Sequence, residues 1–173
     1  MNIEDRCKRV ELLLSDVDGV LTDGGIYFDN QGIEIKQFHI RDGLGIKLWQ
    51  KAGFKFGVLS ARTSHIVKVR AAELNVEVVR QGFENKLPVG KKVIAELGLQ
   101  PDQVCHIGDD LTDLSLLQYV GLSVAVADAA ADVRAAAHYV TTAPGGRGAV
   151  REVVELLLKA KHRWEDLIRS YAV

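Results

Sequence analysis

Six short apolar runs, separated by segments of helical periodicity, limit the fold of this chain more than any other feature of its sequence. Strand-like runs that alternate with helices of about 10–15 residues are typical of βαβ units, whose strands lie parallel in one sheet. Because the runs are continuously apolar, helices should cover both faces of that sheet. We therefore predict an α/β fold, a Rossmann-like three-layer α/β/α structure with a mainly parallel central sheet. The runs span residues 10–15, 54–60, 76–80, 104–107, 122–126 and 138–141.

One segment, residues 22–38, breaks this alternation. Two short β-like arms flank the turn-forming sequence Asp-Asn-Gln-Gly at 29–32, which predicts a β-hairpin. The hairpin follows the first strand directly, at the sheet edge where open α/β folds bind ligands. We treat residues 1–173 as one domain, with a tail at about 162–173 that could be helical or loose. Helices are expected around 44–49 and 66–74, and over 87–97, 111–120, 132–137 and 149–161.

Composition and charge argue against several classes of protein. A chain of 173 residues suits one domain, and its formal net charge of −1 gives no basis for binding nucleic acid or an anionic membrane. No apolar run approaches the ~20 residues of a membrane helix, and the charged first residues lack a signal-peptide core. Cys7 and Cys105 fit no metal or redox spacing, and Cys105 is expected to be a buried packing residue. We expect a cytoplasmic protein without nucleic-acid or membrane partners.

Carboxylates follow two of the predicted strands. Asp16 and Asp18 leave the first run, and Asp109, Asp110 and Asp113 leave the fourth. In a parallel sheet these strand ends share one edge, so like charges meet there at a cost unless a cation or proton is shared. Solvated turn residues or helix caps are the ordinary alternatives, but three carboxylates at one strand end exceed what capping needs. A hard divalent cation with oxygen ligands would relieve the repulsion.

Two further polar residues complete a pattern. Ser60 ends the second apolar run and Lys86 opens a helix; taken singly, they would be a turn serine and a solvated lysine. In chain order the sequence gives Asp-x-Asp-Gly, Ser, Lys and Gly-Asp-Asp-x-x-Asp. This order and spacing resemble the four motifs of the haloacid dehalogenase superfamily.

The resemblance implies a role for each motif. Asp16 would attack phosphorus and become phosphorylated, and Asp18 would protonate the leaving oxygen and then activate water. Ser60 would hydrogen-bond a phosphoryl oxygen, and Lys86 would balance charge. The implied Mg²⁺ ligands are the Asp16 and Asp109 carboxylates and the Asp18 backbone carbonyl.

Asp110 and Asp113 are expected to support these ligands rather than to replace them. The gaps between the motifs leave no room for a cap domain. A single subunit would therefore leave its site open.

A closer resemblance points to the capless 3-deoxy-D-manno-octulosonate 8-phosphate phosphatase family. The residues that carry it are 16–24, 38–46, 108–114 and 145–153. The resemblance implies a Mg²⁺-dependent sugar-acid phosphatase of lipopolysaccharide synthesis. It also implies a homotetramer in which a neighbour's hairpin covers the site.

One departure concerns the second motif, which commonly reads Ser-Gly-Arg in that family and reads Ser60-Ala61-Arg62 here. Ala61 keeps this position small, so we expect Ser60 to be placed as in the family. The candidates for substrate binding are Arg62, Arg70, Arg147 and Thr22. Each of the three arginines has an ordinary alternative, as a surface, helix or loop residue. Arg147 lies in a glycine-rich segment that is flexible by composition. Asp42 is expected either to shape the pocket or to cap its own helix.

Three alternatives stay open, and one of them is a housekeeping phosphatase with broad substrates. The same chemistry could act on a nine-carbon sugar acid 9-phosphate, such as 2-keto-3-deoxy-nononate or N-acylneuraminate 9-phosphate. The chain could also be a non-catalytic oligomerisation module of a sugar-acid cytidylyltransferase system, although intact motifs argue against this. The five histidines share no ligand spacing and are expected to be structural or solvated.

Overall fold

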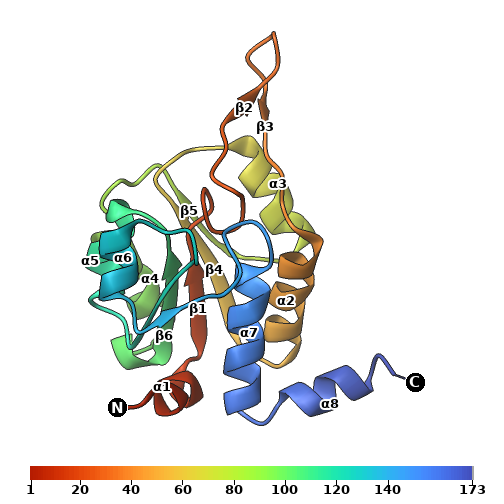
Figure 1. Cartoon of the computed structure of the whole chain (residues 1–173), viewed down its shortest axis with the longest axis vertical. Coiled ribbons are helices and arrows are strands. Elements are labelled where there is room, and N and C mark those ends of the chain that lie inside the picture. The colour runs from red at the N-terminus through yellow and green to blue at the C-terminus, as the bar shows by residue number, and fades with distance from the viewer. Residues whose placement is uncertain (173) are drawn as a thin grey trace.

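A computed structural model of the chain describes residues 1–172. Its centre is a sheet of six strands in which every neighbouring pair is parallel (Figure 1). This arrangement confirms the predicted fold class. In spatial order the strands are β5 (Val78–Gln81), β4 (Lys55–Ser60), β1 (Leu12–Ser15), β6 (Val104–Gly108), β7 (Leu122–Ala125) and β8 (Tyr139–Val140).

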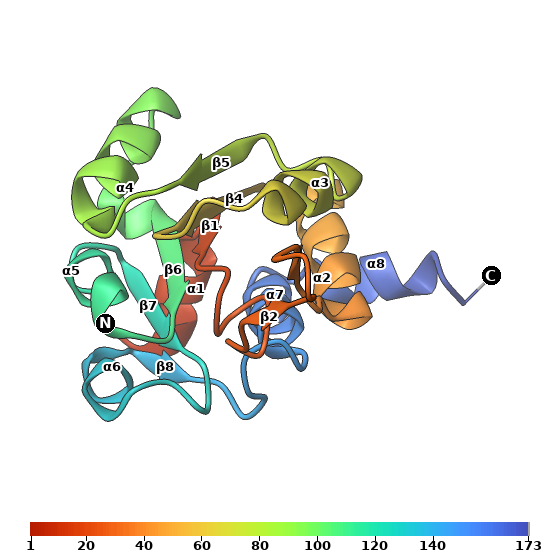
Figure 2. The ribbon, with the colours of Figure 1, turned by 90° about the horizontal axis from the view of Figure 1, so that it is seen from above.

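Helices cover both faces of the sheet, as the apolar runs require. Along β1, Leu13 belongs to the larger apolar cluster, whereas Leu12 and Leu14 belong to the smaller one, because successive strand residues point to opposite faces. Helices α2 and α7 pack against each other over one face, and α4 and α5 lie over the other (Figure 2). The helices are α1 (Ile3–Arg9), α2 (Ile40–Lys51), α3 (His65–Glu73), α4 (Lys86–Glu96), α5 (Leu114–Leu117), α6 (Ala131–Ala136), α7 (Ala149–Ala160) and α8 (Trp164–Arg169).

Two helical segments differ from the sequence predictions. Helix α1 was not expected, because its sequence is mostly charged and lacks an apolar stripe. Asn2 caps its N-terminus, and Cys7 is its single buried residue. The helix predicted over 111–120 is instead a 3₁₀ turn, η2 (Leu111–Asp113), followed by the short α5. A second 3₁₀ turn, η1 (Pro101–Gln103), precedes β6.

The hairpin predicted at 22–38 is present and projects from the body of the molecule (Figure 1). Its strands β2 (Tyr27–Phe28) and β3 (Glu34–Ile35) are antiparallel and only two residues long each. Asp29 shapes the turn, since its side chain accepts hydrogen bonds from the Gln31 and Ile33 amides at 2.8 Å. The short strands leave most of the hairpin's apolar side chains outside any core.

The predicted C-terminal tail contains helix α8, and its last residue, Val173, lies outside the described residues. Between residues 1 and 172, no helix combines the length and apolar character that crossing a bilayer would require.

Candidate active site

The sheet brings the predicted motifs together because β1 lies between β4 and β6. Ser15 is level with Val58 on one side and with Ile107 on the other. Asp16, Ser60 and Asp109 therefore leave adjacent strands at the same edge of the sheet. They open on a cavity of about 240 Å³, which is lined by Asp16, Asp18, Gly24, Ser60, Ala61, Arg62, Asp109, Asp110 and Thr112.

Lys86 lies directly behind Asp16, at the start of α4. Its Nζ is 2.7 Å from Asp16 Oδ2 and 2.7 Å from Asp113 Oδ1, and only 1% of its side chain is exposed. Asp113 Oδ1 is also 2.8 Å from His106 Nε2, and both of these side chains are fully buried. The result is a buried chain of contacts that runs from His106 through Asp113 and Lys86 to the Asp16 carboxylate.

Burial and charge set the protonation of these groups. Burial, helped by the Asp113 charge, raises the pKa of Asp16 to about 6 even though Lys86 opposes the change. Burial alone would also raise the pKa of Asp113, but its bonds to His106 and Lys86 outweigh burial and hold that pKa well below the usual range. Asp113 therefore stays ionised and holds the lysine in place, whereas Asp16, with its pKa of about 6, gains or loses its proton near pH 6.

Asp109 is the group in this pocket whose environment most favours a cation. Burial and the charges of Asp16 and Asp113 raise its pKa to about 8. Its Oδ1 is buried and has no hydrogen-bond partner among residues 1–172. One carboxylate oxygen from each of Asp16, Asp109 and Asp113 lies within 4.8 Å of the others. An oxygen-liganded divalent cation would satisfy the free oxygen and offset this repulsion.

The loop after β1 is held from two sides. The Thr22 hydroxyl accepts hydrogen bonds from the Gly19 and Gly24 amides at 3.3 and 3.2 Å, and 2% of the residue is exposed. The side chain of Thr22, which was predicted to bind substrate, is engaged within this loop. Gly145, in the segment predicted to be flexible, packs so closely that a Cβ would lie 1.8 Å from the Gly19 carbonyl oxygen. The glycines there permit this close backbone approach.

Asp18 faces the hairpin through a network of charges. Its Oδ1 forms an ion pair with Lys36 Nζ, which is also 3.1 Å from Glu34 Oε1. The Glu34 carboxylate accepts hydrogen bonds from Ser64 Oγ at 2.6 Å and from Arg62 at 3.0 Å. The Ser64 bond, followed by those from Lys36 and Arg62, lowers the pKa of Glu34 despite some desolvation. The hairpin is therefore tied to the mouth of the pocket.

The remaining sequence candidates lie in different places. Arg62 lines the pocket with 44% of its side chain exposed. Arg70 lies on α3, 2.8 Å from Glu73 and over the Phe38 ring, and it does not line the cavity that holds Asp16. Arg147 is exposed and also lies outside that cavity.

Asp110 caps η2 by accepting a hydrogen bond from the Leu111 amide. Asp42 caps a different helix from the one expected. It is buried near the start of α2, and its oxygens accept hydrogen bonds from the Gly148 and Arg151 amides at 3.2 and 2.8 Å, so it caps α7.

Four residues of the networks around Asp18 and Lys86 were missed by the sequence analysis: Glu34, Lys36, Ser64 and His106. A signal for the first two exists, because Ile33 and Ile35 alternate with Glu34 and Lys36 and so point away from them. His106 carries no such signal, because the 3₁₀ turn after β6 brings its partner Asp113 back to it, and the sequence pattern did not predict that turn.

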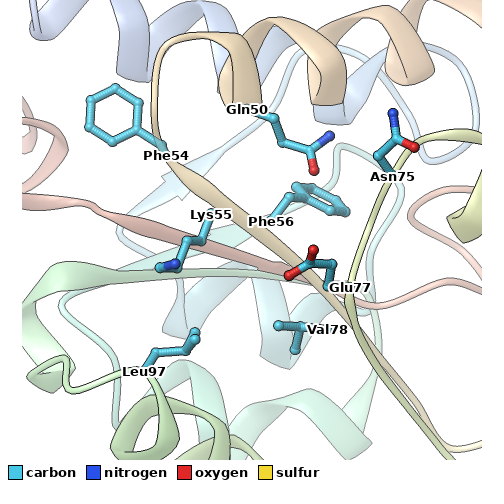
Figure 3. Close-up of a pocket in the computed structure, with 8 residues that line it drawn as sticks. All are labelled: Gln50, Phe54, Lys55, Phe56, Asn75, Glu77, Val78 and Leu97. Atoms are coloured by element: carbon cyan, nitrogen blue, oxygen red, sulfur yellow. The ribbon is translucent and has the colours of Figure 1, made fainter.

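A second cavity, of about 200 Å³, lies at the opposite edge of the sheet, where β4 and β5 begin (Figure 3). Glu77 is the single carboxylate among its lining residues, and Lys55 is the single lysine. No cluster of acidic ligands forms there among the described residues. None of the four motifs contributes a residue to the lining of this second cavity.

Comparison with known proteins identifies the relatives of this chain. The haloacid dehalogenase-like hydrolase family model matches residues 63–152. The 3-deoxy-D-manno-octulosonate 8-phosphate phosphatases of Yersinia pestis and Escherichia coli K12 are 43% and 42% identical to this chain; the matches cover 95% and 93% of it and 88% and 86% of those proteins. A solved phosphatase of the same name from Moraxella catarrhalis, in complex with magnesium, phosphate and a KDO molecule, superposes with a TM-score of 0.96 at 36% identity and covers 98% of this chain and 97% of its own.

Proposed function

This chain belongs to the haloacid dehalogenase-like hydrolases and, within them, to the 3-deoxy-D-manno-octulosonate 8-phosphate phosphatases, and we propose that it hydrolyses that phosphate monoester to the free sugar acid and phosphate. The observation that carries the proposal is that Asp16 and Asp109 line one pocket while Lys86 lies 2.7 Å from the Asp16 carboxylate. The product would enter lipopolysaccharide sugar synthesis. We propose that residues 1–173 act as one hydrolase domain.

The proposed reaction has two steps. In the first, an Asp16 carboxylate oxygen attacks phosphorus as the bond to the sugar oxygen breaks, and Asp18 gives that oxygen a proton. In the second, Asp18 takes a proton from water, whose oxygen attacks phosphorus and releases Asp16. Lys86 and Ser60 stabilise the charge on the phosphoryl oxygens. The 2.7 Å contact between Lys86 and Asp16 supports this assignment.

Mg²⁺ is the cofactor that this site fits. The Asp16 and Asp109 carboxylates and the backbone carbonyl of Asp18 would hold it, and the unpartnered Asp109 oxygen is the feature that favours a ligand role. When bound, the ion neutralises charge on the carboxylates and on the transferring phosphoryl group. Asp113 and Asp110 serve as supports, since the former holds Lys86 and the latter caps η2.

Arg62 is the residue we propose for the sugar carboxylate, because its guanidinium lies at the cavity mouth and suits bidentate pairing. Arg70 and Arg147 do not line the cavity. We keep both as substrate-binding candidates, with Arg147 acting in its own or a neighbouring subunit. Ala61 lines the cavity in place of the family's usual glycine and leaves room for the Ser60 side chain. The nine-carbon substrates remain the alternative, whereas the names of the relatives favour the eight-carbon one.

Phosphate release with Mg²⁺ tests this function. The eight-carbon 8-phosphate and 2-keto-3-deoxy-nononate 9-phosphate are compared side by side, with Asp16→Asn as the blank. A kcat/KM at least tenfold higher for the eight-carbon substrate, about 1.4 kcal/mol, is expected. The reverse preference would keep the mechanism and reassign the substrate. Full activity of Asp16→Asn would exclude the covalent mechanism.

Assembly is a further part of the proposal. Five apolar side chains of the hairpin are about half exposed or more, which suits an interface with other copies. They are Ile26, Tyr27, Phe28, Ile33 and Ile35. We propose a cytoplasmic homotetramer built around these hairpins, in which a neighbour covers the site. Deleting residues 22–38 should give monomers in sedimentation velocity; a surviving tetramer would rule out this interface.

A further inference from the structure

Lys36 differs from its neighbours on the hairpin. Ile33 and Ile35 are more than half exposed, yet only 1% of the Lys36 side chain is accessible. Alternation along the arm turns Lys36 toward the body of the molecule. A buried ammonium is costly unless it is paired with anions and hydrogen-bonded, and here it meets two carboxylates, those of Asp18 and Glu34.

The two carboxylate oxygens of Asp18 have different contacts. Oδ1 is paired with Lys36, whereas Oδ2 lies 4.0 Å from Arg62 Nε, beyond hydrogen-bond distance. Asp18 itself lines the cavity. One oxygen is therefore restrained, and the other is left for exchange of a proton with a substrate or water.

Glu34 restrains the lysine in turn. Its second oxygen accepts the 2.6 Å hydrogen bond from Ser64, and its first is held by Arg62. Ser64 is 4% exposed and lies just before α3. Lys36 is thus fixed between a carboxylate that is anchored on the main body and the carboxylate of Asp18.

We propose that Lys36 is a positioning residue for the known reaction class: it holds the Asp18 carboxylate in the orientation that both proton transfers need. This inference rests on the proposed function. Lys36 itself exchanges no proton with substrate. Its effect is confined to the steps in which Asp18 protonates the leaving oxygen or deprotonates water, and substrate binding does not depend on it.

Leaving-group dependence separates this role from the others. A sugar alkoxide needs a proton as it leaves, whereas p-nitrophenolate does not. We expect Lys36→Met to lower kcat for the sugar-acid phosphate by about 10²-fold with KM unchanged. With p-nitrophenyl phosphate, the first-turnover burst of p-nitrophenolate should keep its rate while the later steady-state rate falls. Lys36→Arg should restore most of the kcat.

Lys55→Met, at the opposite edge of the sheet, is the matched control and should behave like the unmodified protein. A raised KM with unchanged kcat would make Lys36 a substrate-binding residue instead. Equal losses in the p-nitrophenolate burst and in sugar-phosphate turnover would reduce its role to structure; either result overturns the proposal.

Turnover of the sugar-acid phosphate by the unmodified protein tests the proposed function separately. If that substrate is not hydrolysed, the same comparison is made with glycerol 2-phosphate as the alkyl phosphate. The two proposals therefore fail by different measurements.

Discussion

Replacing Lys86 by methionine would remove a buried cation that lies between two buried carboxylates. Its Nζ is 2.7 Å from an oxygen of each of Asp16 and Asp113. At an effective dielectric constant of about 20, each attraction is worth about 6 kcal/mol at this distance. Desolvation of the three charges cancels much of that gain, and removing one partner of a buried pair costs about 3–5 kcal/mol. We expect the free energy of unfolding to fall by this amount at pH 8 without metal.

The loss should shrink as the pH falls. Burial raises the pKa of Asp16 to about 6, above the value of about 4 that it has when unfolded. The folded state therefore takes up a proton here before the unfolded state does, and ionised Asp16 destabilises the folded protein at high pH. Below about pH 6 the neutral carboxyl no longer needs the lysine. At pH 5.5 the difference between variant and unmodified protein should be smaller than at pH 8.

Thermal unfolding in EDTA, followed by tryptophan fluorescence, measures this prediction. A loss of 3–5 kcal/mol lowers the Tm of a chain of this size by about 10 °C. Lys92→Met is the matched control, because Lys92 lies on the same helix with 75% of its side chain exposed. A Lys86→Met protein no less stable than this control at pH 8, or one with the same loss at both pH values, would refute the electrostatic argument.

Three shorter predictions follow from the same geometry. Mg²⁺ binding should release protons between about pH 6 and 8, because the pKa values of Asp16 and Asp109 are raised to about 6 and about 8 in the metal-free site. Calorimetry in two buffers of different ionisation enthalpy measures this release, and identical heats of binding would contradict it. Asp42→Ala should cost about 1–2 kcal/mol in urea unfolding through the lost cap of α7, whereas an unchanged midpoint would show that the cap is dispensable. Gly146→Ala should cost about 1–3 kcal/mol, since φ is +66° and a Cβ would lie 2.3 Å from the Thr22 carbonyl carbon; a variant of full stability would show that the two loops can separate.

Much of this site could be predicted because its residues are adjacent to strand ends. Asp16 and Asp109 follow apolar runs that the pattern predicts to be parallel strands. Only the order of the strands had to be known to place the two carboxylates side by side. Asp42 shows where this reasoning stops. Its position near a helix start suggested a cap, but its partners, the amides at Gly148 and Arg151, are more than 100 residues away in sequence. Only the packing of α2 against α7 identifies the helix that it caps.

Lys36 extends the same argument to the chemistry. A charged residue in a short, turn-rich hairpin is expected to be solvated, and the hairpin strands are indeed too short to bury anything between themselves. The Lys36 side chain is buried because the arm lies against the segment that holds Arg62 and Ser64, and because Asp18 follows β1 next to it. The hairpin thus contacts the active site of its own subunit through the ion pair between Lys36 and Asp18, while its apolar side chains face outward. Each of the two faces can then be altered without the other: Lys36→Met should impair proton transfer and leave assembly intact, whereas substitution of Phe28 by a polar residue should weaken assembly and leave the Asp18 contact in place.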